Sequence, residues 1–471
     1  MSRNKRKKEY LRTESGNAER FAAEYGTLVK FDHQRERWLL WDSLRHRWLE
    51  DRQSKVRVLM RETIRQQFRR VVDLPESDER KKEIRWSLRS ESRNVLDASL
   101  ELAKSIAPLG DDGEGWDANP WLLGVANGIV DLRTATLRQA KTDDHITLYS
   151  PVAFDRGAKC PHFEKFIFEV CNGDKELVGF IQRAMGYTLT GLSDEQCLFL
   201  CHGSGANGKS TLLGIVHHIL GDYAVNVPFS ALEKQGRSNI TNDLAMLSGR
   251  RFATALETGE DVQLNEARIK TITGGDQITA RYLYHEHFTF NPTHKLWLAV
   301  NHKPRILDES EGMWRRMRLI PFEKQFSGEN RDNKLSDKLK AEAPGILAWA
   351  VEGALQWQKE GLGQPPSVAK ATAAYRKESD HLAGFLDECC LRLPARGVPV
   401  AALWKRYLQW AEDNEEPTLS RRAFSDRMQR AGYRKGRSGH GGTRVWVGLT
   451  LADRVTSADT ISNDSSIAKS I

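Results

Sequence analysis

A glycine-rich turn followed by a lysine and two hydroxyl residues is the clearest sign of chemistry in this sequence. The pattern is GxxxxGK[ST], and it is made of Gly203, Ser204, Gly205, Ala206, Asn207, Gly208, Lys209, Ser210 and Thr211. In such a turn the backbone N–H groups surround the phosphates of a nucleotide, the lysine reaches the β- and γ-phosphates, and the first hydroxyl binds Mg²⁺. The turn therefore predicts a site for ATP and Mg²⁺, with Lys209 as a catalytic cation and Ser210 as a metal ligand.

Two apolar segments are expected to position this turn. Residues 197–201 form a short apolar run typical of a buried strand, and residues 212–220 carry apolar side chains at helical spacing. The turn then lies at the N-terminus of a helix, where the partial positive charge favours phosphate. Strand, turn and helix in this order predict a P-loop, which motors, kinases and GTPases share.

A carboxylate follows the next apolar strand, which is predicted over residues 251–256. Glu257 ends this strand at the position of a Walker B acid, where it could polarise the attacking water or help to hold Mg²⁺. Glu260 and Asp261 lie close by, so the identity of the carboxylate that serves the metal stays open.

An amide and two arginines follow two further apolar segments. Asn301 ends a strand predicted over 296–300, and an amide there can orient water against the γ-phosphate. Arg315 and Arg316 stand before the apolar run 317–322, where a neighbouring subunit could use one of them as an arginine finger.

The phrases GSGANGKST, ALETGE, IKTITGGDQITARYLY, FNPTHKLWLAVNHKP and MWRRMRLIPF occur in this order between residues 203 and 322. Together they resemble the superfamily 3 helicases, in particular the helicase portion of phage and plasmid primase–helicases. That group also includes the poxvirus replicative nucleoside triphosphatase. The resemblance extends upstream through GNAERF, WLLWD and NGIVDLRTATL, and covers roughly residues 15–450.

The resemblance implies an AAA+-like motor that forms a ring, expected to be a hexamer, with DNA in its channel. It assigns Lys209 and Ser210 to phosphates and Mg²⁺, Glu257 to Walker B and Asn301 to a sensor. Lys270, Gly274, Gly275 and Asp276 then belong to the motif before a DNA-contacting hairpin, which the alternation of residues 282–290 also indicates. The candidates for contact with single-stranded DNA are Lys270, Arg281, Tyr284, His285 and His287.

The C-terminal part of the chain predicts a small basic module. Residues 398–412 have a helical pattern, a second helix is expected from Ser420, and 433–437 and 443–448 are expected to form two strands. This outline is that of a winged helix, which the resembled family also carries. Residues 421–444 contain eight Lys or Arg residues and one Asp, the electrostatic footprint of DNA binding. The candidates for contact with duplex DNA are Arg421, Arg422, Arg434, Lys435 and Arg437.

The expected fold class is α/β, with a P-loop core between an α+β domain and a winged helix. The predicted parts are an N-terminal α+β domain, a helical connector, the ATPase core, a helical segment, the winged helix and a disordered tail. Their bounds are 1–150, 151–191, 192–325, 326–378, 379–450 and 451–471. About 190 residues before the turn leave no room for a primase fold, so a separate primase is an expected partner.

Composition excludes several classes of protein. The net charge of +8 over 471 residues favours an anionic partner. Six scattered cysteines predict reduced thiols, and no apolar run is long enough to span a membrane, so a soluble cytoplasmic protein of a bacterial cell or infected host is expected.

Three functions remain open from the sequence. The preferred one is an ATP-dependent DNA helicase that replicates a phage, prophage or plasmid-like element without its own primase domain. A DNA-binding replication initiator that uses ATP only for assembly is the alternative. A P-loop kinase is a third, but it would need an acceptor site and would have no use for the basic C-terminal module.

Overall fold

The computed structural model describes residues 10–234, 242–256, 259, 262–281, 286–307, 310–328, 332–414, 416, 418–438 and 442–452. The sequence-predicted residues Glu257, Glu260, Asp261, Tyr284 and His285 lie outside these ranges. Backbone contacts divide the chain into two units, one of residues 1–304 with 315–369 and one of residues 305–314 with 370–471. Each unit is described by itself.

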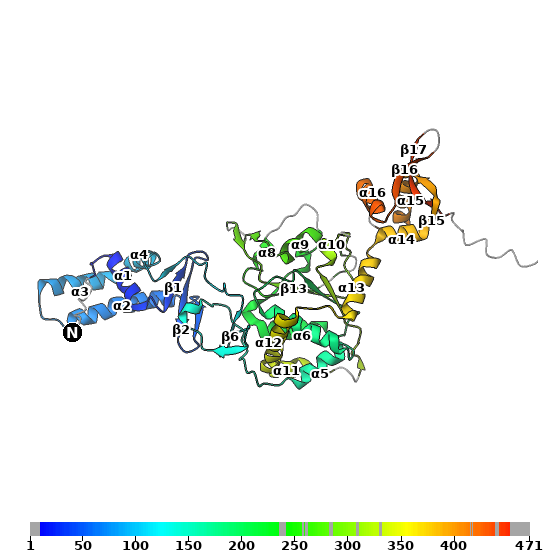
Figure 1. Cartoon of the computed structure of the whole chain (residues 1–471). Helices are drawn as coiled ribbons and strands as arrows, with labels where there is room; N and C mark the ends of the chain where they lie inside the picture. The colour runs from blue at the N-terminus through cyan, green and yellow to red at the C-terminus, as the bar shows by residue number, and fades with distance from the viewer. Residues whose placement is uncertain are drawn as a thin grey trace, which may run out of the picture. The chain divides into compact units, whose positions relative to one another are not determined.

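A five-stranded parallel sheet forms the centre of the first unit (Figure 1). Its order is β14-β8-β13-β10-β9, and each neighbouring pair runs parallel. The strands are β8 Leu198–His202, β9 Ala224–Asn226, β10 Phe252–Leu256, β13 Lys295–Val300 and β14 Met317–Pro321. All six residues of the central strand β13 are buried, as in parallel sheets covered on both faces. The sheet confirms the predicted α/β class.

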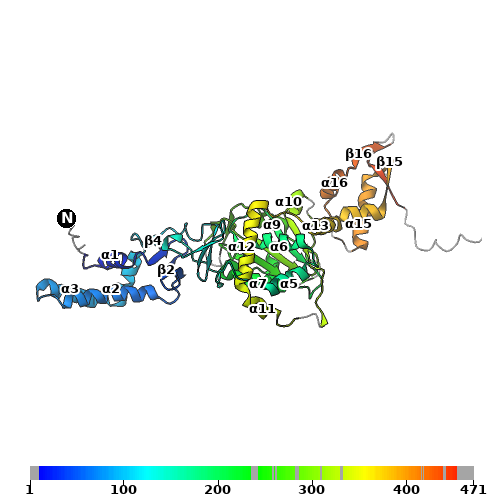
Figure 2. The ribbon, with the colours of Figure 1, turned by 60° about the horizontal axis from the view of Figure 1, so that its bottom comes forward.

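Helices before and after the sheet in sequence share one hydrophobic core with it. They are α5 Pro161–Val170, α6 Lys175–Leu189, α7 Lys209–Leu220, α11 Leu335–Ala341 and α12 Ala343–Glu360, and Figure 2 shows α12 beside α6. Helices α6 and α12 approach closely through glycines, because a Cβ on Gly186 would lie 2.0 Å from the Ala354 nitrogen. Residues predicted as a connector, 151–191, and as a separate helical segment, 326–378, therefore contribute side chains to the same core as the strands.

Four short elements of the first unit lie between β9 and β13 in the sequence. They are α8 Asn242–Ala245, α9 Glu266–Thr273, β11 Ile278–Ala280 and β12 Phe288–Phe290. The predicted hairpin over 282–290 is displaced: β11 pairs antiparallel with β12, so one strand lies before Tyr282. Ile278 and Ala280 are buried, and their burial stabilises a first strand that begins earlier in the sequence than the aromatic alternation indicated.

The N-terminal part of the first unit contains helices and two small sheets. Its helices are α1 Glu14–Tyr25, α2 Lys55–Val72, α3 Asp78–Ser90 and α4 Arg93–Ala103. One sheet, in the order β3-β2-β1-β4, has the strands β1 Val29–Asp32, β2 Arg37–Asp42, β3 Arg47–Glu50 and β4 Gly110–Asp111. The other has the strands β5 Leu122–Val125, β6 Gly128–Asp131 and β7 Thr136–Arg138. Each sheet contains an antiparallel hairpin, formed by β2 with β3 in the first and by β5 with β6 in the second.

The second unit has its own hydrophobic core. Its helices are α10 Glu311–Trp314, α14 His381–Cys389, α15 Val400–Asp413 and α16 Arg421–Arg430, and α13 Pro366–Glu378 enters it from the first unit. An antiparallel sheet in the order β15-β17-β16 has the strands β15 Cys390–Pro399, β16 Arg434–Ser438 and β17 Thr443–Leu451. The two predicted helices and the two predicted strands are present, whereas α14 and β15 were not predicted.

No helix in the described ranges combines the length and the apolar character needed to cross a bilayer.

Candidate functional site

The glycine-rich turn joins the carboxyl end of β8 to the first residue of α7, as the motif predicted. Gly205 and Gly208 have positive φ values of +96° and +88°, which a residue with a Cβ rarely adopts. At Gly203 a Cβ would lie 2.1 Å from Asn207 Nδ2 and 2.2 Å from the carbonyl oxygen of Phe322. The turn therefore depends on glycine both for its backbone shape and for its close packing.

Lys209 is held beneath the turn by one oxygen of the turn itself and one of the segment that follows β13. Its side chain is 4% exposed, and its ammonium donates to Asn207 Oδ1 at 3.0 Å and to Asn301 Oδ1 at 3.1 Å. Asn301 follows β13, the strand beside β8. Two residues that the sequence assigned to one site, 92 positions apart, are thus in direct contact.

Asn207 links three parts of the site. Its Nδ2 donates to the carbonyl oxygen of Phe322 at 3.1 Å while its Oδ1 accepts from Lys209. The segment after β14 adds two more bonds to the turn, from Gln325 Nε2 to Ser204 Oγ at 2.7 Å and from the Phe326 N–H to the Ala206 carbonyl oxygen at 2.8 Å. The end of β14 therefore supports the turn, a role that the motif alone does not indicate.

These residues fit the triphosphate of a nucleotide and its magnesium ion. A cation is buried at the carboxyl end of the sheet, and α7 begins there without a side-chain cap on its first N–H groups. Anions are stabilised at such a helix N-terminus. Ser210 is exposed in the first turn of α7, where a hydroxyl can reach a metal ion. The thiol of Cys201, just before the turn, stays neutral because burial raises its pKa to about 12.

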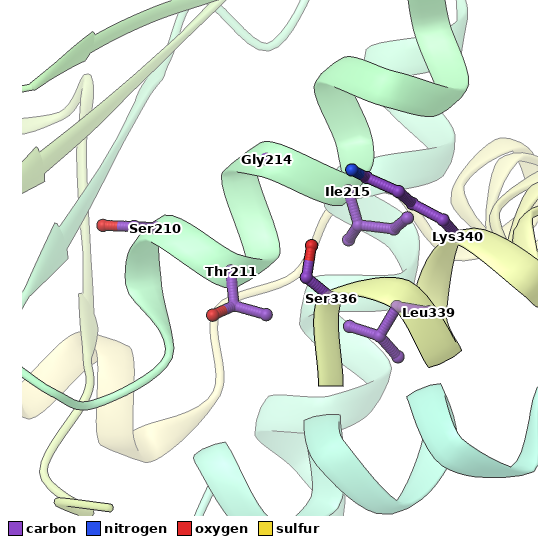
Figure 3. Close-up of a pocket in the computed structure, with 7 residues that line it drawn as sticks. All are labelled: Ser210, Thr211, Gly214, Ile215, Ser336, Leu339 and Lys340. Carbon is purple, nitrogen blue, oxygen red and sulfur yellow. The ribbon is translucent and has the colours of Figure 1, made fainter. Parts of the chain in front are cut away.

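A cavity of about 360 Å³ continues from the turn between α7 and α11 (Figure 3). Ser210, Thr211, Gly214 and Ile215 line it from α7, and Ser336, Leu339 and Lys340 line it from α11. Figure 3 shows the Ser336 hydroxyl and the Lys340 chain directed toward α7. Sequence reasoning missed Ser336 and Lys340, because α11 follows Ser210 by more than 120 residues and has no motif.

The two candidate finger arginines lie at the opposite edge of the sheet from the turn. Met317 is paired with Leu198 and Pro321 with His202, so the residues before β14 lie beside the start of β8. Arg315 Nη2 donates to Gln196 Oε1 at 3.4 Å, just before β8. Arg315 is exposed, whereas Arg316 is 8% exposed and burial lowers the pKa of its guanidinium.

The candidate contacts to single-stranded DNA gather at the same edge as Arg315. Gln196 also donates to the carbonyl oxygen of Gly274 at 2.7 Å, so the residues after α9 lie near the start of β8. Lys270 is half-buried on α9, and Arg281 and His287 are exposed between β11 and β12. Two of the candidates, Arg281 and His287, thus lie in one hairpin and Lys270 lies on the helix before it, while Tyr284 and His285 are outside the described residues.

The C-terminal basic residues lie on two elements of the second unit. Arg421 and Arg422 are exposed in the first turn of α16, and Arg434, Lys435 and Arg437 are exposed on β16. Lys435 donates to Ser425 Oγ of α16, which joins the helix to the hairpin. The structure therefore presents all five cations on neighbouring surfaces of one small fold.

Three family models match successive parts of the chain. Residues 18–172 match a model described as D5 N terminal like, 201–316 a family of unknown function (DUF5906), and 377–442 a model described as Poxvirus D5 protein-like. The chain is therefore similar to D5-type, superfamily 3 helicase-like proteins, which confirms the resemblance that its motifs predicted.

The chain is similar to several viral proteins. The chain is 28% identical over 322 residues to a protein of Acanthamoeba polyphaga mimivirus named "Putative helicase", an alignment that covers 63% of this chain and 34% of the relative. It is 26% identical over 329 residues to an African swine fever virus protein named "Putative primase", again covering 63% and 34%. The chain spans about a third of the length of these relatives.

A solved structure has the same fold at low sequence identity. The apo structure of the NrS-1 C-terminal region superposes with a TM-score of 0.51 and 10% identity, over 89% of this chain and 95% of that one. This likeness supports the α/β architecture alone.

Proposed function

We propose that the chain is the motor of an ATP-dependent DNA helicase of the D5 type, with a P-loop core and a winged-helix DNA-binding module. The observation that carries this proposal is the contact between Lys209 and Asn301 at the carboxyl edge of a parallel sheet. A P-loop lysine beside a polar sensor on the next strand can distinguish a nucleotide that keeps its γ-phosphate from one that has lost it.

In the proposed site Lys209 binds the β- and γ-phosphates and Asn301 orients the attacking water. Ser210 and Glu257 hold Mg²⁺, which neutralises phosphate charge when bound. The cavity lined by Ser336 and Lys340 takes the ribose and base, since it continues from Ser210 and Thr211. The glycine-rich turn contributes backbone N–H groups and excludes water from the phosphates.

The position of Arg315 favours a ring in which each site is completed by a neighbour. β8 is five residues long, and at roughly 3.3 Å per residue its first and last residues are about 13 Å apart. Arg315 lies near the start of β8 and the turn follows its end, so this arginine can reach the phosphates of another copy rather than those of its own chain. We therefore assign the finger to exposed Arg315, and not to buried Arg316. A head-to-tail interface of this kind can close into a ring, and we propose that the ring is a hexamer.

DNA-stimulated hydrolysis of ATP is the test of this function. We expect the chain to hydrolyse ATP faster with single-stranded DNA. In Lys209→Ala the hydrolysis rate should be at least about a hundredfold lower, because this substitution removes the phosphate-binding cation. Lys165→Ala, which alters an exposed lysine of α5 with a 77% exposed side chain, is the matched control.

The two alternatives predict different results in the same assay. An initiator that uses ATP only for assembly would form the oligomer with ATP, yet would not unwind a forked duplex. A kinase would move phosphate from ATP to a small acceptor and ignore DNA. A monomeric chain whose rate of ATP hydrolysis does not change with DNA would contradict the helicase proposal.

A further inference from the structure

The second unit contains a cavity of about 770 Å³ between α15, α16 and the β16–β17 hairpin. Its size lies within the roughly 300–1,000 Å³ range of sites that hold small ligands. All of its lining residues belong to the described part of this unit. The proposed ATP site of the first unit includes none of these lining residues.

The lining combines cations with aromatic rings. The lining contains four cations, Arg421 and Arg422 from α16, Lys435 from β16 and Arg444 from β17, and a single carboxylate, Asp426. Within the described ranges no carboxylate pairs with Arg421, Arg422 or Arg444, so their charge is available to an anionic ligand.

The aromatic part of the cavity comes from Trp404 and Trp446. Trp404 is half-buried on α15 and packs against Phe424 with ring centroids 5.3 Å apart, which leaves part of the indole at the cavity. Trp446 is 1% exposed, and the Lys435 ammonium lies 5.0 Å from its ring. The indole N–H of Trp446 is buried and meets no acceptor among the described residues, so this ring contributes apolar surface and its cation–π contact with Lys435 to the lining.

A flat ring attached to phosphate matches this lining. Indoles stack on nucleobases, and guanidinium groups bind phosphate oxygens. The bases of an intact duplex are stacked inside it and cannot enter a recess, whereas an unpaired base can be splayed out into one. The recess therefore favours a nucleotide without a pairing partner over the groove of a closed duplex.

We infer that this cavity binds one unpaired nucleotide of a DNA strand, with its base against Trp404 and its phosphate between Arg422 and Arg444. The module would then recognise the junction between duplex and single strand, rather than duplex DNA alone. This inference rests on the proposed function, because it takes DNA as the ligand of the second unit. The inference also specifies where the C-terminal module would bind on a replication fork.

Binding of the full-length chain to three probes tests the inference. The probes are a blunt duplex, the same duplex with a short unpaired tail, and free thymidine monophosphate, all measured without ATP. We expect the tailed duplex to bind about tenfold more tightly than the blunt one. Trp404→Leu should abolish this difference while leaving the affinity for the blunt duplex unchanged. Equal affinities of the wild type for tailed and blunt DNA would overturn the inference, as would free nucleotide that binds as tightly as the tail.

Two further variants keep the test informative if Trp404→Leu does not fold. Arg422→Ala changes an exposed residue, and it should also reduce the preference for the tail. Arg434→Ala alters an exposed cation of β16 outside the cavity lining, so it should weaken binding to both duplexes alike and leave their ratio unchanged. The inference fails if Arg434→Ala lowers the ratio as much as Arg422→Ala does.

A fluorescent base in the tail locates the contact. We expect 2-aminopurine at one tail position to be quenched by the wild type and not by Trp404→Leu; the absence of any such position contradicts the inference. A chain that hydrolyses ATP but shows no tail preference contradicts this inference alone. A chain that prefers the tail but does not hydrolyse ATP contradicts only the proposed function.

Discussion

At the scale of single residues, the candidate nucleotide site depends on a few closely packed residues of the turn. A larger side chain at Gly203 would collide with its neighbours. Gly203, Asn207 and Lys209 form one continuous set of contacts with the carbonyl oxygen of Phe322. The motif predicts that these residues bind phosphate, and the contacts show that they also support one another. A substitution at one of them should therefore act through the shape of the turn.

Gly203→Ala tests the close packing of the turn. The added methyl group would lie 2.1 Å from Asn207 Nδ2 and 2.2 Å from the Phe322 carbonyl oxygen, and neither neighbour can move without losing a hydrogen bond. We expect ATP to bind at least tenfold more weakly, measured by calorimetry. Gly179→Ala is the matched control: the new methyl group in α6 meets only Arg183 Nη1 at 3.5 Å, so it should raise stability by about 0.5–1 kcal/mol and leave ATP binding unchanged.

His294 predicts a loss of stability in mild acid. Burial and the neighbouring Lys295 lower its pKa from 6.5 to about 4 in the folded chain. Because the unfolded chain then binds the proton more readily, protonation favours unfolding, and stability falls as the pH drops from about 6.5 to about 4. We expect this residue alone to contribute a loss of about 2 kcal/mol by pH 5. Hydrogen exchange of β13 amides at pH 7 and pH 5 would measure it, and His294→Gln should reduce the difference. An equally large difference in that variant would contradict the assignment to His294.

At the scale of elements, two buried cations join segments that are far apart in the sequence. Arg251 is 4% exposed before β10, and it donates to the carbonyl oxygens of Leu189 at 2.6 Å and Leu122 at 2.7 Å. Lys295, the first residue of β13, donates to the carbonyl oxygens of Leu192 at 3.2 Å and Thr293 at 3.0 Å. Burial lowers the pKa of both groups, and the carbonyl oxygens compensate by accepting their hydrogen bonds.

Arg251→Met should destabilise the first unit. The methionine can fill the space, but the carbonyl oxygens of Leu122 and Leu189 would be left buried without donors, at roughly 1–3 kcal/mol each. We expect a loss of about 2 kcal/mol or more in chemical denaturation, with faster hydrogen exchange in β5. Arg133→Ala removes an exposed ion pair with Asp131 in the same hairpin and should change little. Equal effects of the two variants would show that the buried arginine does not hold β5 in place.

At the scale of the whole molecule, the parallel direction of the strands separates Lys209 from Arg315. This separation bears on whether one copy of the chain could form the proposed site for ATP hydrolysis. The turn with Lys209 is at the carboxyl edge of the sheet and Arg315 is at the amino edge, beside Gln196. A single chain therefore cannot bring both groups to one phosphate. The proposed assembly places the carboxyl edge of one copy against the amino edge of the next.

A mixing experiment tests this arrangement. Lys209→Ala and Arg315→Ala should each be inactive in DNA-stimulated ATP hydrolysis, the first for lack of the phosphate-binding cation and the second for lack of the finger. In an equimolar mixture, about a quarter of head-to-tail interfaces would join an intact Lys209 to an intact Arg315, so activity should partly return. Lys165→Ala, which alters the exposed lysine of α5, is the control, and it should hydrolyse ATP at the wild-type rate. No recovery in the mixture would contradict a finger supplied by a neighbour.

Local pattern was sufficient to predict the glycine-rich turn, its strand and helix, the strands ending near Glu257 and Asn301, and the helices and hairpin of the basic module. These features have a period or a motif that is complete within a few residues, and local backbone preference is enough to predict them. The same locality explains the errors. The hairpin of β11 and β12 starts earlier than its aromatic alternation indicated, and β15, with seven of its ten residues exposed in succession, has no alternation to find.

The sequence by itself thus determined the nucleotide motif, the α/β class and the concentration of positive charge near the C-terminus. Only the tertiary structure decided which distant residues meet. It brought Asn301 to Lys209, Ser336 and Lys340 to the side of α7, and Trp404 to the cations of α16 and β17. It also put Arg315 at the sheet edge away from the turn. These contacts arise from the parallel order of strands and from burial of apolar faces in a shared core, and no short stretch of sequence records either.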